Sequence, residues 1–167
     1  MAHPLVDQLR FTRAEWLRGL RGIPEADGLR RFEPMNSIGW IVGHLAWQEQ
    51  RYWQSRAQGR LPVPVLDELV AYRAPATTPP LGEMLAAWRT ITKANDPWLD
   101  ALTTDGLLAD LPPPGGRRSV GDSIQRVTYH YWFHIGEIQA IRQLRGHPRL
   151  PEYVGDIERH ATYRPEG

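Results

Sequence analysis

The chain has 167 residues, of which 41% are hydrophobic and 23% are charged, so it can bury a core and is not disordered throughout. Its 20 basic and 19 acidic side chains leave a net charge of +1, which argues against a dedicated nucleic-acid-binding protein. The absence of cysteine excludes a disulfide scaffold, a cysteine nucleophile and a thiolate metal site. The length predicts one domain over residues 1–167.

The location of the protein is predicted from what the sequence lacks. No basic segment followed by an apolar segment opens the chain, which argues against a secretory signal. No stretch approaches 18 consecutive apolar residues, so no membrane-spanning helix is expected. Together with the lack of cysteine, these features favour a cytoplasmic protein.

Two long helices are predicted in the N-terminal half. Apolar residues recur on one helical face from Pro4 to Leu20, and proline suits the first helical position. A second helix is expected to begin at Asn36–Ser37, which are good N-caps, and to end at Gly59. Residues 21–35 between them are expected to form a loop.

The second helix contains two glycines at an i, i+4 spacing, Gly39 and Gly43. Each glycine costs about 1 kcal/mol relative to alanine in a helix interior. The pair therefore predicts the close approach of a neighbouring backbone.

The C-terminal half predicts two more helices. Residues 60–80 form a long connection that holds one short helical turn at 66–72. The third helix covers Leu81 to Leu102, and Pro97 is expected to kink or restart it, with Asp96 as the local cap.

The fourth helix is predicted from the capping pattern at Ser119–Asp122 to Leu144, with Gly146 beyond its end. The proline-rich segment 105–118, with Pro112–Gly116 at its centre, is expected to form a loop, and the tail 149–167 to be irregular. No segment alternates with the period of a strand. The fold class expected is therefore all-α, a four-helix bundle with connections of about 14 to 21 residues that leave room for a pocket.

Histidine spacing gives the first indication of chemistry. His130 and His134 are four residues apart, so they lie about 40° apart on one face of the fourth helix and can reach one metal ion. Three histidines lie outside the predicted helices and are expected to be solvated side chains, namely His3, His147 and His160.

The surroundings of the pair strengthen the case for a metal site. The same helical face carries residues suited to the interior of a bundle, namely Ser123, Val127, Ile138 and Ile141. Buried imidazoles without partners cost about 1–3 kcal/mol each, and a metal ion would satisfy both. His44 lies beside the apolar face of the second helix and is the natural third ligand. The alternative is that all three are core or capping histidines.

Three neutral imidazoles suit a divalent ion such as zinc or nickel, with one position left for water or a substrate. An open site of this kind can lower the pKa of water to about 7, polarise a carbonyl or activate a thiol. Two familiar motifs do not fit. Tyr131 stands where a metalloprotease helix needs its glutamate base, and no glutamate lies three residues before any of the three histidines, as a di-iron bundle requires.

The sequence resembles the DinB/YfiT-like superfamily. The resemblance rests on Gly43-His44-Leu45 and on the run His130-x-x-x-His134-x-Gly136-Glu137-Ile138, which closes at Arg142 and Gly146. It implies a four-helix bundle that holds a divalent metal through His44, His130 and His134, often as a homodimer. It also implies either a transferase or isomerase that uses a low-molecular-weight thiol such as mycothiol or bacillithiol, or a metal-dependent hydrolase.

Four further residues are candidates for the site. Glu137, three residues after His134, can accept a hydrogen bond from an imidazole or act as a catalytic base. Gln48, one turn after His44, can hold a water, while Arg51 and Arg126 can bind an anionic substrate. Their ordinary roles would be those of boundary polar groups and surface ion pairs.

Three hypotheses of function follow. The first is a metalloenzyme that activates water or a small thiol toward a small-molecule substrate. The second is a non-catalytic, metal-binding or small-ligand-binding stress protein on the same scaffold. The third is a structural helical dimer whose histidines satisfy one another without metal.

Overall fold

The computed structural model describes residues 2–113, 118–155 and 157–163, without the side chain of His160. Within these ranges every regular element is helical, which confirms the all-α prediction. The long helices are α1 (Pro4–Leu20), α3 (Ile38–Glu49), α5 (Leu81–Asp100) and α7 (Val120–Leu144). A π-helix, η1 (Gln50–Arg56), continues α3. The short helices are α2 (Glu25–Leu29), α4 (Leu66–Leu69), α6 (Thr104–Leu108) and α8 (Ile157–His160).

Contacts between residues divide the chain into two compact units. Unit 1 comprises the chain up to Gly22, Leu99–Ala109 and the part from Ser119 onward, and so holds α1, α6, α7 and α8. Unit 2 comprises Ile23–Trp98 and Asp110–Arg118, and so holds α2, α3, η1, α4 and most of α5. The single domain expected over residues 1–167 stays a prediction.

The predicted helix starts are built by side-chain caps. The Ser37 hydroxyl accepts a hydrogen bond from the Trp40 N–H at 3.1 Å, and the Ser119 hydroxyl accepts one from the Asp122 N–H at 3.0 Å. These bonds satisfy backbone donors that lack partners at a helix N-terminus. The caps confirm the starts expected for α3 and α7.

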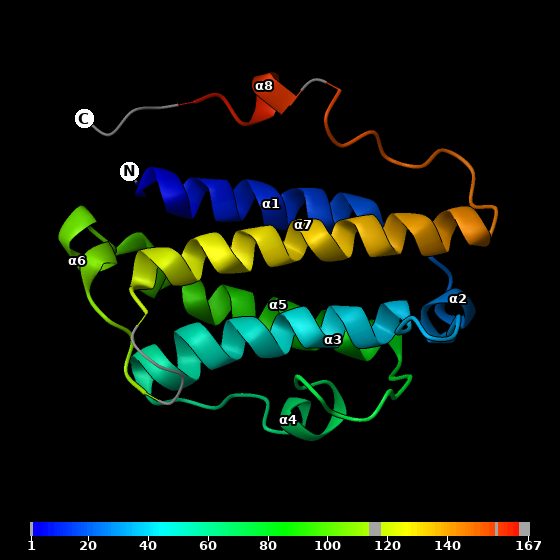
Figure 1. The fold of residues 1–167 in the computed structure, drawn as a ribbon, viewed down its shortest axis with the longest axis horizontal. Helices are drawn as coiled ribbons and strands as arrows, with labels where there is room; N and C mark the ends of the chain where they lie inside the picture. The colour runs from blue at the N-terminus through cyan, green and yellow to red at the C-terminus, as the bar shows by residue number, and fades with distance from the viewer. Residues whose placement is uncertain (1, 114–117, 156, 164–167) are drawn as a thin grey trace. The chain divides into compact units, whose positions relative to one another are not determined.

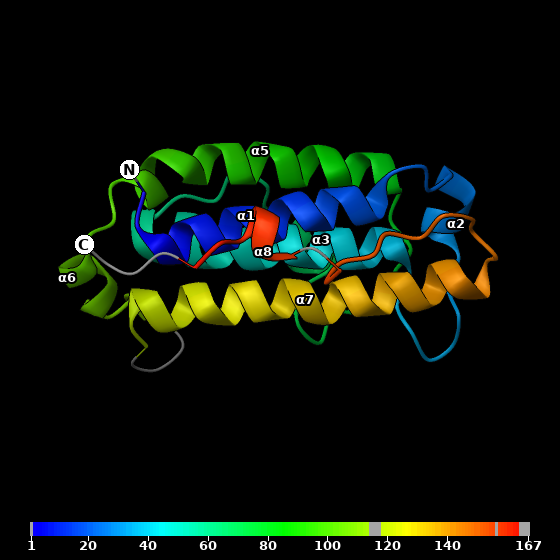
Figure 2. The ribbon, with the colours of Figure 1, turned by 90° about the horizontal axis from the view of Figure 1, so that it is seen from above.

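Unit 1 is built on the packing of α1 along α7, which lie side by side in both views (Figures 1 and 2). Trp16 of α1 meets Tyr131 of α7 edge to face, with ring centroids 5.6 Å apart, and both side chains are buried. In the last turn of α7, the Arg142 guanidinium donates to the Gly19 carbonyl at 2.6 Å. This pairing of aromatic packing and a buried charge-assisted hydrogen bond fixes the register of the two helices.

In unit 2, the two glycines of α3 are sites of close approach. A Cβ added at Gly39 would lie 2.2 Å from the Pro79 carbonyl oxygen, and one added at Gly43 would lie 2.5 Å from Met84 Sδ. The close backbone approach predicted for this pair is thus confirmed at Gly39. At Gly43 the neighbour is a side chain instead.

A buried polar network also joins the elements of unit 2. Asn95 of α5 donates to Glu49 Oε2 at 3.1 Å and accepts from Gln54 Nε2 at 2.6 Å. All three side chains are at most 2% exposed. Buried polar groups need such partners, and here the central amide serves both neighbours at once.

Several sequence expectations about the connections were wrong. The segments 21–35 and 105–118, expected to be loops, contain α2 and α6, and the tail contains α8. These helices span only four or five residues, too few to show a helical period in the sequence. Within the expected loop Pro112–Gly116, residues 114–116 lie outside the described residues.

One expectation about the long helices was wrong in part. The helix after Leu81 was expected to be kinked or restarted at Pro97, and it is not restarted there but continues to Asp100. Beyond the proline, Trp98 stacks on Trp53 at 5.5 Å and Leu99 is fully buried, which offsets the hydrogen bond that proline cannot donate. The second long helix was expected to run to Gly59, and the structure adds that it continues from Gln50 to Arg56 in π geometry.

Candidate metal centre

His134 of α7 is held by Glu137 on the next turn. Its Nδ1 lies 2.5 Å from Glu137 Oε2, and the side chain is only 7% exposed. Because a carboxylate accepts hydrogen bonds, the imidazole Nδ1–H is the donor in this pair. In the neutral ring, Nε2 is then the unprotonated nitrogen, as a metal ligand requires. Glu137 was predicted either to accept a hydrogen bond from an imidazole or to act as a catalytic base, and the structure shows the hydrogen bond.

His130 lies one turn before His134 and faces it, as their spacing predicts. The two Nε2 atoms are 3.0 Å apart, and the ring planes meet at 60°. Two nitrogens at this separation can both bind one ion at the usual Zn–N distance of about 2.0–2.1 Å. They can equally share one proton in a hydrogen bond, so the pair fits a metal without requiring one.

His44 of α3 is built into unit 2 in a similar way. Its Nδ1 lies 2.7 Å from the Val70 carbonyl oxygen, which can only accept, so Nδ1–H donates and Nε2 is left as an acceptor. The ring stacks between Trp40 at 4.7 Å and Trp47 at 5.4 Å. Stacking on both faces together with the hydrogen bond fixes the orientation of the imidazole and selects its tautomer.

The carbonyl that holds His44 belongs to a connection that α3 and η1 fasten at two further points. Trp47 Nε1 donates to Asp67 Oδ1 at 2.7 Å. The Gln50 amide donates to the Val63 carbonyl at 3.0 Å and accepts from the Val63 N–H at 2.7 Å. The long connection after the second helix is therefore a support for His44 and not a free loop.

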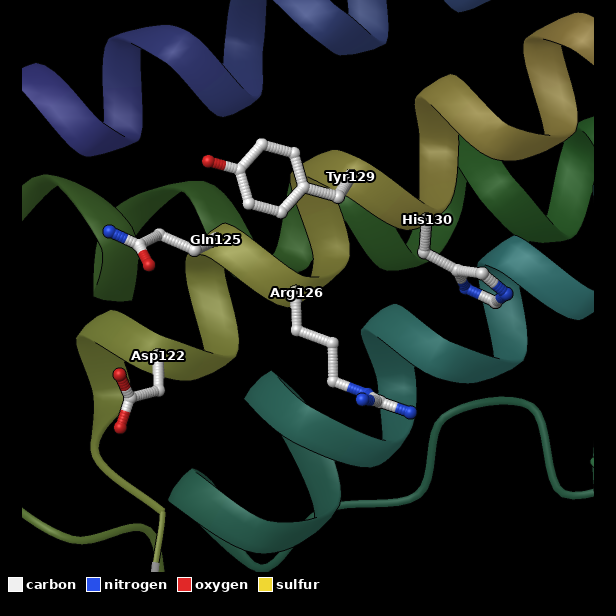
Figure 3. Close-up of a pocket in the computed structure, with 5 residues that line it drawn as sticks. All are labelled: Asp122, Gln125, Arg126, Tyr129 and His130. Atoms are coloured by element: carbon white, nitrogen blue, oxygen red, sulfur yellow. The ribbon is translucent and has the colours of Figure 1, made fainter.

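The remaining predicted site residues have different surroundings. Gln48 is buried on α3, whereas Arg51 is exposed and places its guanidinium 5.2 Å above the Trp47 ring. Arg126 is exposed on α7, one turn before His130. Figure 3 shows Arg126 and His130 projecting to the same side of α7, while Tyr129 projects away from them.

Arg126 and His130 border an open pocket of about 470 Å³ along α7, lined by Asp122, Gln125, Arg126, Tyr129 and His130. The pocket offers a cation, a carboxylate and an amide within two helical turns. Unit 1 therefore holds four of the candidates predicted from the sequence, namely His130, His134, Glu137 and Arg126, the last at the pocket beside His130.

Two histidines assigned to solvent have structural partners. His3 Nδ1 accepts from the Leu5 N–H at 3.2 Å and caps α1, and His147 Nδ1 accepts from Arg142 Nε at 3.3 Å. The position of His3 directly before a proline-initiated helix was the signal that would have predicted its capping role. The side chain of His160 lies outside the described residues.

Comparison with known proteins adds the family. No curated protein matches the chain. Within the described residues, no helix combines the length and the apolar character needed to cross a bilayer. A family model described as the DinB superfamily matches residues 8–138, a range that covers most of the chain and includes all three candidate ligands. The chain therefore belongs to the DinB superfamily.

Proposed function

We propose that this DinB superfamily protein is a metalloenzyme that binds one divalent ion, zinc or nickel, through Nε2 of His44, His130 and His134. The observation that carries the proposal is the facing pair of Nε2 atoms on α7, 3.0 Å apart, with the opposite nitrogen of His134 held by Glu137. A hydrogen bond to the far ring nitrogen is the usual support of a histidine that binds metal.

The third ligand is supported by the same logic in unit 2. The Val70 carbonyl holds the proton of His44 on Nδ1, and two indoles fix the ring plane. The tautomer that this hydrogen bond selects leaves Nε2 unprotonated, as a metal ligand requires. The donor set of three neutral imidazoles suits zinc or nickel better than magnesium or calcium, which prefer oxygen ligands.

When bound, the ion would act as a Lewis acid on a substrate carbonyl or lower the pKa of a water or of a small thiol. The protein's own groups supply the rest. Glu137 keeps the proton on Nδ1 of His134 and so keeps Nε2 available. Arg126, at the edge of the groove beside His130, is placed to bind an anionic part of the substrate or thiol. Gln48 and Arg51 are proposed as further substrate contacts, and the reaction as a hydrolysis or a thiol transfer.

We further propose that the protein forms a homodimer through the outer face of α7. Three large apolar side chains on this helix are exposed, namely Tyr129 at 68%, Phe133 at 62% and Leu144 at 63%. A Cβ added at Gly136, between them, would meet no atom within 4 Å. Aromatic residues are enriched at protein interfaces, and a second copy of α7 would cover this stripe. Sedimentation should show a dimer, and Phe133→Glu should give monomers.

The metal site is tested by plasma mass spectrometry of the untagged protein. Wild type should carry about one zinc or nickel per chain, and His130→Ala, His134→Ala and His44→Phe should lose it. The phenylalanine keeps the stacking between the two indoles, so loss of metal there reports the missing ligand and not a collapsed wall. His147→Ala removes an imidazole outside the site and should keep the metal.

Each alternative predicts a different result. A protein that stays metal-free even after incubation with zinc and nickel would contradict the proposal and leave the histidines as partners of one another. Stoichiometric metal without turnover in ester, amide and thiol-transfer screens would contradict the catalytic part. It would favour the non-catalytic metal-binding protein on the same scaffold.

A further inference from the structure

A second pocket, of about 540 Å³, lies within unit 1 between α1, α7 and the segment 157–163. A volume of this size is typical of pockets that bind small molecules. Its wall combines aromatic and aliphatic side chains with short polar ones, the principal members being Phe11, Trp132, Ile157, Ala161, Thr128 and Asp7.

This pocket is distinct from the candidate metal centre. Thr128 and Trp132 share one face of α7, four residues apart, as His130 and His134 share another. At 100° per residue, Thr128 lies about 200° from His130 around the helix. The two pairs therefore point to opposite sides of α7, and only Tyr129, on the ridge between them, lines both pockets.

Thr128 gives an independent sign that the pocket takes a ligand. Its side chain is only 8% exposed, and its hydroxyl has no hydrogen-bond partner among the residues that the structure describes. A buried hydroxyl without a partner costs free energy, so such groups call for an explanation. A threonine in a helix has two accessible χ1 rotamers, so a rotation about χ1 can turn the hydroxyl toward another side of Cβ.

The lining also restricts the chemistry of the ligand. The Phe11 and Trp132 rings lie 6.3 Å apart and are tilted by 41°, which offers an aromatic surface for a planar ring. The pocket has one carboxylate, from Asp7, and no lysine or arginine among its described lining residues. An anion would therefore meet no compensating charge there.

We propose that this pocket binds an uncharged aromatic molecule that carries a hydrogen-bonding group, with Thr128 as the polar contact. The aromatic part packs against Phe11 and Trp132, and a donor on the ligand satisfies the Thr128 hydroxyl. The segment from Ile157 to Tyr163 forms the outer wall, so the C-terminal part of the chain belongs to the binding site.

The probe for this site is N-phenyl-1-naphthylamine, an uncharged aromatic amine whose fluorescence rises in apolar surroundings. Titration into the purified full chain should show saturable binding of one molecule per chain. The matched probe 1-anilinonaphthalene-8-sulfonate has the same rings and amine and one added sulfonate. It should bind more weakly, because the pocket offers that charge a carboxylate and no cation.

Three variants separate the hydroxyl from the apolar wall. Thr128→Val keeps the shape and should weaken binding of the amine by about 2- to 12-fold, the range of one neutral hydrogen bond. Thr128→Ser restores the hydroxyl and should recover the affinity. Thr90→Val is the control, because Thr90 lies on α5, outside the pocket, and its hydroxyl already donates to the Ala86 carbonyl. This variant should not change the affinity for the amine.

Three results would overturn the proposal. One is the absence of saturable binding of the uncharged probe, and another is equal affinity of the two probes. The third concerns stability: Thr128→Val removes a hydroxyl without a partner, so its unfolding midpoint should not fall. A clear fall would show that the hydroxyl is already bonded within the protein and is not available to a ligand.

Discussion

Replacement of Glu137 by glutamine tests whether the charged hydrogen-bond acceptor on His134 raises the affinity of the site for zinc. The Glu137 carboxylate accepts the Nδ1–H of His134 at 2.5 Å and so keeps the proton away from Nε2. An amide oxygen can still accept this hydrogen bond, but without the charge. Glu137→Gln therefore keeps the shape of the site and removes only the charge assistance.

The size of the effect follows from the geometry. A hydrogen bond to a charged group contributes about 1.5–3 kcal/mol, against about 0.5–1.5 kcal/mol for a neutral one. Like ends of these two ranges differ by about 1–1.5 kcal/mol. The Glu137 side chain is 34% exposed, so solvent screens the charge and the effect should not exceed this difference. Since 1.4 kcal/mol is a factor of ten, the Kd for zinc should rise about tenfold. This is the lower edge of the range seen for outer partners of metal-binding histidines.

The assay is a competition titration of zinc into metal-free protein with a chromophoric chelator. Glu83→Gln is the matched control, because Glu83 is an exposed glutamate in the first turn of α5. The thermal midpoint of the metal-free Glu137→Gln protein should match wild type within a few degrees. Equal zinc affinity in wild type and Glu137→Gln, or an equal loss in Glu83→Gln, would show that the Glu137 charge does not support zinc binding.

Three further predictions concern the packing that supports the site. Gly39→Ala places a Cβ 2.2 Å from the Pro79 carbonyl, so urea unfolding should show a loss of about 1–3 kcal/mol; no loss would refute the close approach. Asn95→Leu leaves Glu49 and Gln54 without their shared amide and should cost at least about 2 kcal/mol by the same assay, and a neutral result would show that the network adds nothing. Burial raises the pKa of the Tyr153 phenol above its ordinary value of 10.0, so the stability it contributes is present below pH 10 and is lost as pH rises through the raised pKa. Urea midpoints between pH 8 and pH 11 should therefore fall more steeply for wild type than for Tyr153→Phe, and parallel curves would contradict the assignment.

Local signals in the sequence were sufficient to predict the long helices. Ser37 and Ser119 have the chemistry of an N-cap, and each begins a helix by capping a backbone N–H. The spacing of His130 and His134 was equally informative, because four residues bring two side chains together on any helix. Features within one turn of each other depend on helix geometry alone, and this is why they could be predicted.

Features that depend on contacts distant in sequence could not be predicted in this way. The partner of His44 is the carbonyl of Val70, which lies 26 residues further along the chain and whose backbone has no side-chain signature. The π segment Gln50–Arg56 contains no glycine or proline that would mark a change of helix geometry in the sequence. The second pocket needs α1, α7 and the tail together, and the tail showed no helical period.

We propose that one ion binds through Nε2 of His44, His130 and His134. The most direct measurement is a crystal grown with zinc and recorded on both sides of the zinc absorption edge. We expect one anomalous peak per chain within bonding distance of the three Nε2 atoms, with Glu137 and the Val70 carbonyl still hydrogen-bonded to Nδ1 of His134 and of His44. A peak bound through Nδ1, a peak away from these histidines, or a direct hydrogen bond between His130 and His134 with no ion would contradict it.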